Sequence, residues 1–177
     1  MQDRADHCLI DRARSGDSEA FARLVEQYYS TIFRVAYKWA GNQADAEDIA
    51  QDVCVKLGQA IRSFKGTSAF SSWLYRVTLN AVRDFQRARK RRTENIAAMA
   101  LVSGTEYVPD METEMTQDQL WLAVRRLPDK QRDAMLLIYA EDMSHKEAAS
   151  VMDCAESTVS WHVHEAKKRL KEELQGY

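Results

Sequence analysis

Helical periodicity runs through nearly all of this 177-residue chain, and it favours a bundle of helices over any other fold. Apolar residues recur three and four positions apart, and only six glycines and two prolines interrupt them. Helices are expected at residues 6–14, 18–40, 44–62 and 70–92, and again from residue 117 onward. The predicted fold class is therefore all-α, with short loops between antiparallel helices.

One segment breaks this pattern and divides the chain. Residues 93–116 contain Gly104 and Pro109, five acidic residues and no lysine or arginine. Such a composition is typical of a linker between two domains. We therefore expect a four-helix N-terminal domain at residues 1–92, a flexible acidic linker at 93–116, and a second helical domain at 117–177.

The segment from residue 64 to residue 92 has two chemically different faces. Numbered as one helix from Phe70, its apolar positions recur at helical spacing and predict a buried face. A second stripe follows the same period and is largely cationic. The buried face comprises Phe70, Trp73, Leu74, Val77, Ala81 and Phe85, and the cationic stripe comprises Arg76, Asn80, Arg83, Arg87 and Lys90.

This arrangement favours nucleic acid as a partner. Aromatic rings can stack on unpaired bases, and a row of cations can follow the phosphates. Six cations lie between Arg83 and Arg92 with a single acid, Asp84, which is denser than a solvated helix face requires. The alternative is a core-facing helix whose basic back is merely solvated.

The overall charge argues against a protein that grips duplex DNA alone. The formal net charge is −2: the balance is +5 for residues 1–92, −5 for residues 93–116 and −2 for residues 117–177. Because phosphate contacts dominate DNA affinity, such a protein usually has a basic balance. Either DNA is not the partner, or another protein supplies much of the affinity for DNA.

Composition also limits the other classes of function. The three cysteines and four histidines lack ligand spacing, so we expect neither a disulfide framework, a metal site nor a cofactor. No apolar run approaches the roughly 18 residues that span a bilayer. No signal peptide is visible either, so membrane insertion is not expected and a cytoplasmic location is.

The second domain ends in two helices across a tight turn. Ser144 and Glu147 have the spacing of a capping box before the first of them. Two helices joined by a turn of three to four residues form a helix-turn-helix unit, which reads DNA with its second helix. A generic helical hairpin is the alternative. The polar face of the last helix comprises Ser157, Ser160, Trp161, His164, Glu165 and Lys168.

These segments together resemble the extracytoplasmic-function (ECF) group of the sigma-70 family, the promoter-recognition subunits of bacterial RNA polymerase. The matching residues are DAEDIAQDVCVKL, SFKGTSAFSSWLYRVTLNAVRDFQRARKRR, LPDKQRDAMLLIYAEDMSHKEAASVMDCAESTV and HEAKKRL. The resemblance implies two helical domains joined by a flexible linker, a non-enzymatic function, and core polymerase, promoter DNA and an anti-sigma factor as partners.

The resemblance also implies roles for single residues. Polymerase binding falls to Asp45, Glu47, Asp48, Gln51 and Asp52, although acids that simply favour a helix N-terminus would fit equally well. The resemblance assigns minus-ten recognition and melting to the loop at residues 63–69 and to the cationic stripe of the helix that follows. The residues concerned are Ser63, Phe64 and Lys65 of the loop and Arg76, Asn80, Arg83, Arg87 and Lys90 of the stripe. Minus-thirty-five recognition falls to Ser157, Thr158, Ser160, Trp161, His164, Glu165 and Lys168.

The last helix departs from the resemblance. Many members of the family have Lys or Arg where this chain has Ser160, His162 and Glu165, and a small residue in place of Trp161. Since Arg pairs with guanine and Glu accepts from cytosine, a different minus-thirty-five sequence is expected.

Three other functions are alternatives to a sigma factor. A stand-alone helix-turn-helix regulator is disfavoured by the weak net charge, and a helical metal-dependent hydrolase by the scattered histidines. A structural adaptor would leave the Arg83–Arg92 cluster unexplained.

Overall fold

The computed structural model describes residues 2–100 and 117–175, with side chains for residues 7–93 and 120–173. Every regular element within these ranges is helical, as the sequence predicts. The N-terminal domain contains α1 (Gln2–Arg14), α2 (Ser18–Ala40), α3 (Gln43–Ala60), the short 3-10 helix η1 (Ile61–Ser63) and α4 (Phe70–Ala100). The C-terminal domain contains α5 (Gln117–Arg126), α6 (Asp129–Tyr139), α7 (His145–Met152) and α8 (Glu156–Gln175).

Local signals set both ends of α2. The Asp17 carboxylate accepts 3.0 Å hydrogen bonds from the backbone N–H groups of Glu19 and Ala20, which satisfies donors that a helix start leaves unpaired. At the other end Gly41 takes φ 86°, a left-handed conformation that glycine adopts without strain, and its N–H donates to Tyr37 O. Asp17 therefore caps the start of α2, and Gly41 ends the helix.

Two predicted helix ends in the N-terminal domain are wrong. The third helix ends at Ala60 and tightens into η1 instead of continuing to residue 62. The fourth helix continues to Ala100, past the predicted linker start at residue 93. Residues 93–100 contain three alanines and no glycine or proline, so nothing in them stops a helix. The rest of the predicted linker, residues 101–116, lies outside the described residues.

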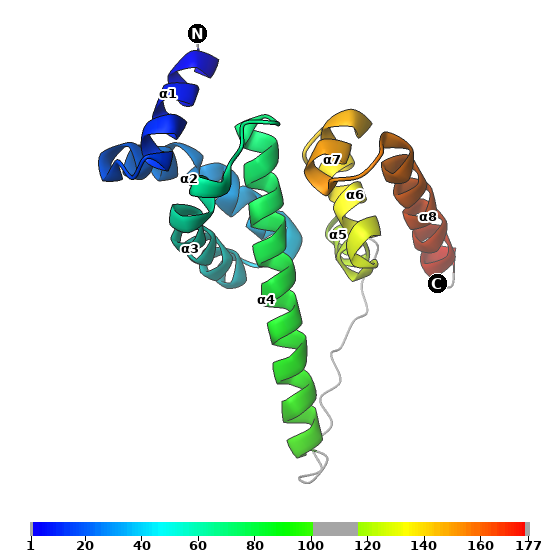
Figure 1. The fold of residues 1–177 in the computed structure, drawn as a ribbon. Coiled ribbons are helices and arrows are strands. Elements are labelled where there is room, and N and C mark those ends of the chain that lie inside the picture. Colours follow the sequence, from blue (N-terminus) through cyan, green and yellow to red (C-terminus); the bar gives the residue numbers. More distant parts are fainter. Residues whose placement is uncertain (1, 101–116, 176–177) are drawn as a thin grey trace.

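The N-terminal core lies between α2, α3 and α4. Its largest fully buried side chains include Trp39 and Leu24 of α2, Leu57 of α3 and Leu74 of α4. Figure 1 shows α4 standing between α2 and α3 on one side and the C-terminal helices on the other, with its C-terminal half extending beyond them. The predicted apolar face of α4 packs against α2 and α3, as Phe70, Leu74 and Ala81 are buried.

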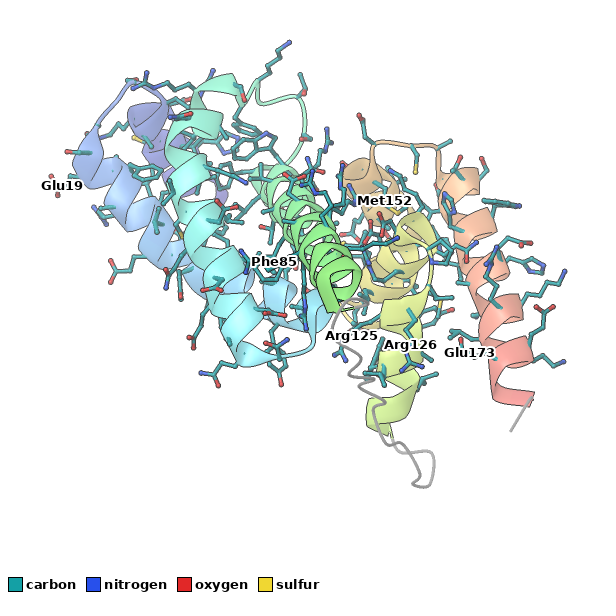
Figure 2. All side chains as sticks on the ribbon, turned by 90° about the horizontal axis from the view of Figure 1, so that it is seen from below. Glu19, Phe85, Arg125, Arg126, Met152 and Glu173 are labelled. Carbon is teal, nitrogen blue, oxygen red and sulfur yellow. The ribbon has the colours of Figure 1, made fainter. Side chains whose placement is uncertain are left out.

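The C-terminal domain is built around α6. Seven consecutive residues, Gln131–Leu137, are buried, although the sequence pattern predicts only one apolar face. The reason is that α7 and α8 cover one side of α6 while the N-terminal domain covers another. In Figure 2, which looks along α4 (green), α6 (yellow) lies between α4 and α8 (red). The face of α8 opposite its polar face is buried and comprises Val159, Val163, Ala166 and Leu170.

Candidate nucleic-acid interface

The cationic stripe of α4 divides into an exposed half and a covered half. Toward its C-terminal end Arg87 and Lys90 are exposed, with Arg87 Nη2 3.6 Å from Asp84 Oδ1. Asn80 is also exposed, and its side-chain oxygen accepts a 3.1 Å hydrogen bond from Arg83. Arg76 and Arg83 instead reach the C-terminal domain. The stripe that the sequence predicts as one surface is therefore divided between solvent and a second domain.

Aromatic side chains anchor the loop that precedes α4. Phe64 is only 7% exposed, with its ring centroid 5.4 Å from that of Phe70 and 5.2 Å from that of Trp73. Ser63 closes the turn by donating a 2.7 Å hydrogen bond to Ala60 O, and Lys65 is exposed. The Phe64 ring thus holds the loop in place instead of presenting a stacking surface, and the half-buried Trp73 joins it.

The first turns of α8 present a mixed polar and aromatic face. Ser157, Ser160, His164 and Lys168 are exposed, and the Trp161 side chain is 56% exposed. Thr158 and Glu165 are half-buried at the border of this face. The structure therefore brings together all seven residues that the resemblance assigns to the minus-thirty-five element. His162 lies behind them, half-buried, where burial lowers its pKa.

The helix before α8 is fixed at both ends. Ser144 N–H donates a 2.8 Å hydrogen bond to Glu147 while Glu147 N–H donates to Ser144 Oγ, so the predicted capping box is present. The Ser144 hydroxyl, which donates a 2.7 Å hydrogen bond to the Glu147 carboxylate, and the Ser144 N–H together lower the pKa of that carboxyl. The turn to α8 is made by Asp153 in the left-handed region at φ 55°. This is a helix-turn-helix whose second helix has an exposed face.

The α3 residues to which the resemblance assigns polymerase binding share an outward face only in part. Asp48, Gln51 and Asp52 are exposed, and Asp52 forms a 2.7 Å ion pair with Lys56. Glu47 is half-buried and accepts a 2.7 Å hydrogen bond from Gln43. Asp45 instead pairs with Arg89 of α4, a contact between two distant segments that the sequence pattern does not reveal.

Sequence reasoning missed a group of carboxylates that connect the two domains. Asp133 accepts hydrogen bonds from Trp39 and Arg83, and Glu141 accepts one from Tyr75. One signal was available: Asp133 immediately precedes the apolar run from Ala134 to Ile138, and an acid buried there requires a partner. The identity of that partner cannot be read from a local pattern.

Other classes of site find no support in the described part of the chain. Within it, no three His, Cys, Asp or Glu side chains gather closely enough to hold a metal ion. No described helix combines the length and apolar character needed to cross a membrane. Cys8, Cys54 and Cys154 are free thiols, and burial raises the pKa of Cys54.

Both domains match known protein families. Residues 24–92 match the model of sigma-70 region 2, and residues 117–170 match that of sigma-70 region 4. The RNA polymerase sigma-H factor of Pseudomonas aeruginosa is 30% identical over 96% of this chain and 94% of its own. The ECF RNA polymerase sigma-E factor of Escherichia coli K12 is 28% identical over 96% and 94% of the two chains.

Solved structures agree with this assignment. The chain is similar to CnrH in its complex with the cytosolic domain of CnrY, with a TM-score of 0.66 and 25% identity over 97% of this chain and 98% of that one. It shares its fold with the sigma factor RpoE of Bartonella quintana, solved with the anti-sigma factor NepR, at a TM-score of 0.63 and 24% identity over 88% and 96% of the two chains. Since the similarity spans both helical domains, the chain belongs to the sigma-70 family, within its ECF group.

Proposed function

We propose that this chain is an ECF sigma factor that directs core RNA polymerase to specific promoters. The observation that carries the proposal is the presence of a region 2 domain and a region 4 domain on one chain. Its task is recognition and strand capture, not catalysis, and it is carried out in the cytoplasm with the polymerase. The net charge of −2 disfavours the stand-alone regulator, which would have to hold DNA without polymerase.

The loop 63–69 and the exposed part of the α4 stripe would capture the opened minus-ten strand. Asn80 offers both a donor and an acceptor, which suits the hydrogen-bonding edge of an unstacked base. Arg87 and Lys90 continue the stripe below it and suit adjacent phosphates. Lys65 lies on the exposed side of the loop that Phe64 anchors. In this proposal Phe64 positions the loop, and its neighbours make the contacts.

The exposed face of α8 would enter the minus-thirty-five major groove. Trp161 and Glu165 are one helical turn apart, so they address neighbouring base pairs from the same face. A carboxylate is an acceptor and matches the amino group of cytosine. Lys168 lies one turn beyond His164 along the helix, and its exposed ammonium suits a phosphate.

The exposed polar residues of α3 would bind the polymerase. Asp48, Gln51 and Asp52 form a continuous outward surface, whereas Asp45 is engaged by Arg89 and contributes less directly. An anti-sigma factor is proposed as a further partner. Two similar structures are described as a sigma factor with NepR and as CnrH with the cytosolic domain of CnrY, and this chain covers nearly all of both.

Transcription with purified core polymerase tests the function. Promoters are first selected from a random library by the reconstituted holoenzyme, and run-off transcription is then measured with the chain, with core, and with both. We expect transcripts only when both are present. Tight, sequence-specific duplex binding by the isolated chain that is unaffected by core would favour the stand-alone regulator instead.

A further inference from the structure

A small cavity lies between α4 of the N-terminal domain and the start of α6 and end of α7 in the C-terminal domain. Its volume is about 230 Å³. Its polar lining comprises Arg76, Asn80 and Arg83 of α4, Lys130 of α6 and Asp153, which follows α7. Three of these five side chains are cations and one is an acid, so the cavity favours an anionic occupant.

Hydrogen-bond donors at this cavity are left without acceptors. Arg76 Nη2 donates a 2.8 Å hydrogen bond to Ser150 O, but Arg76 Nε is buried and has no hydrogen-bond partner among the described residues. Lys130 is exposed and forms no hydrogen bond or ion pair with another described residue. Asn80 accepts from Arg83 through its side-chain oxygen, so its amide nitrogen is left to donate elsewhere. Because a buried donor without a partner is costly, Arg76 Nε indicates a bound water or ion.

The charges available to a ligand come from both domains. Arg83 donates to the fully buried Asp133 from Nε and Nη2, so its charge is already neutralised. Asp153 lies 3.9 Å from Arg76 Nη1, but its side chain is 82% exposed, so solvent screens this pair. Arg76 of α4 and Lys130 of α6 therefore remain as the two cations that an anion can neutralise.

The size and the walls of the cavity limit what the anion can be. Sites for drug-sized organic molecules measure about 300–1,000 Å³, and this cavity is smaller. Its apolar wall is formed by Leu79, Val151 and Met152, all buried; Figure 2 shows Met152 on α7 beside α4. Apolar surroundings strengthen the attraction between charges. A guanidinium matches the oxygens of a tetrahedral oxyanion, and an ammonium and an amide supply further donors.

We propose that this cavity binds inorganic phosphate between Arg76 and Asn80 of α4 and Lys130 of α6. The ion accepts the hydrogen bonds that Arg76 Nε, the Asn80 amide and the Lys130 ammonium do not make within the chain. Because it is held by both domains, bound phosphate also stabilises the contact between them. A phosphate of a DNA strand has the same chemistry, but a strand that follows the α4 stripe needs no contact with Lys130. The site does not depend on the sigma function proposed above.

Three substitutions in the full chain test the site. Lys130→Ala removes the cation that the C-terminal domain supplies. Lys171→Ala is the matched control, because it removes the same charge from an exposed position on α8 that does not line the cavity. Asp153→Asn removes the acid that competes for Arg76; Asp153 has φ 55°, and asparagine also adopts this left-handed conformation. All three positions are exposed, and circular dichroism checks that each variant keeps its helix content.

The line width of the phosphorus-31 NMR signal measures phosphate binding, because the line broadens when part of the ion is bound to the protein. Phosphate is titrated at constant ionic strength, which sodium chloride maintains. We expect saturable binding to the wild type and to Lys171→Ala. Lys130→Ala should bind about tenfold more weakly, as for the loss of a hydrogen bond to a charged group. Asp153→Asn should bind several times more tightly than the wild type.

Fluorescence anisotropy with a labelled oligo(dT) distinguishes the free ion from a DNA phosphate. We expect Lys130→Ala to keep the wild-type affinity for oligo(dT) while it loses phosphate. If Lys130→Ala weakens both ligands equally, the cavity takes a phosphate of the DNA backbone, and a dedicated site for the free ion is refuted.

Two further outcomes would overturn the phosphate site. Broadening that does not saturate, or that Lys130→Ala and Lys171→Ala reduce equally, would show that phosphate only adsorbs to surface charge. Asp153→Asn with no gain in affinity would show that the anion does not use Arg76. Run-off transcription with core polymerase reports separately on the sigma function; Lys130→Ala should equal the wild type there, because Lys130 belongs to neither proposed DNA-binding surface.

Discussion

Replacing Phe64 with alanine should unfold part of the N-terminal domain before it affects any contact with a base. The Phe64 ring is 7% exposed and meets Phe70 and Trp73 at centroid distances of 5.4 and 5.2 Å. Phe70 in turn meets Tyr28 of α2 at 5.2 Å, so the cluster ties the loop to α2 and α4. Removing one ring therefore loosens the loop and the start of α4 together.

The size of this effect follows from what is removed. A buried Phe→Ala change costs about 3–5 kcal/mol, including two aromatic contacts of about 0.5–1.5 kcal/mol each. Because the cluster lies near the surface and can partly collapse, we expect about 3 kcal/mol. Phe64→Leu keeps most of the apolar volume and should cost about 1 kcal/mol.

Hydrogen exchange measured by mass spectrometry suits this prediction, because a two-domain chain does not unfold in one step. Phe64→Ala should lose protection in peptides from α2 and α4, while peptides from α6 and α8 change little. Lys65→Ala is the matched control: it should leave protection unchanged and weaken binding of single-stranded DNA. If Phe64→Ala keeps full protection but loses DNA affinity, the ring contacts bases and the anchoring role is wrong.

Three further predictions concern the proposed sites and the domain junction. Asn80→Ala should impair promoter melting more than polymerase binding, because in the proposed function its amide binds an unstacked base; permanganate footprinting should show the defect on duplex templates but not on pre-melted ones. Glu165→Arg should change which minus-thirty-five bases are preferred, by about 1–3 kcal/mol in competition among promoter variants, as a cytosine acceptor becomes a guanine donor. Lys168→Ala should instead weaken binding to all promoter variants equally and flatten its salt dependence. If Glu165→Arg also changes the binding of every variant equally, Glu165 only positions the helix and its assignment is wrong. Burial, aided by the hydrogen bond to Glu141, raises the pKa of Tyr75 to about 12, so its stabilising contribution is complete below about pH 10 and is lost as pH rises through about 12. Ultraviolet absorbance titration against Tyr75→Phe should show this late tyrosine, and Glu141→Gln should lower its pKa; titration near 10 in the wild type would contradict the buried junction.

The helices could be predicted from the sequence because their signals are local. Asp17 and Gly41 bound α2, the Ser144–Glu147 capping box begins α7, and apolar residues at helical spacing in α2 and α8 are buried. The predicted end of α4 at residue 92 is too early because the sequence changes in charge there and not in structure. Alanine-rich residues continue a helix whatever their net charge.

The sequence of α4 alone could not predict that the C-terminal domain covers a second side of this helix. Thr78, Leu79 and Val82 are buried together with the face that periodicity identifies, so two sides of the helix are covered. The spacing of Arg76 and Arg83 shows that they share a stripe, but not whether phosphates or carboxylates neutralise them. A phosphate and a carboxylate both satisfy a guanidinium. In this structure Arg83 is paired with the carboxylate of Asp133, a residue 50 positions further along the chain.

The uneven charge of the chain favours the contact between its two domains. The N-terminal segment, residues 1–92, carries +5 and the C-terminal segment, residues 117–177, carries −2, so the two domains attract each other across their polar junction. Salt screens this attraction and also weakens the binding of DNA to the same cations.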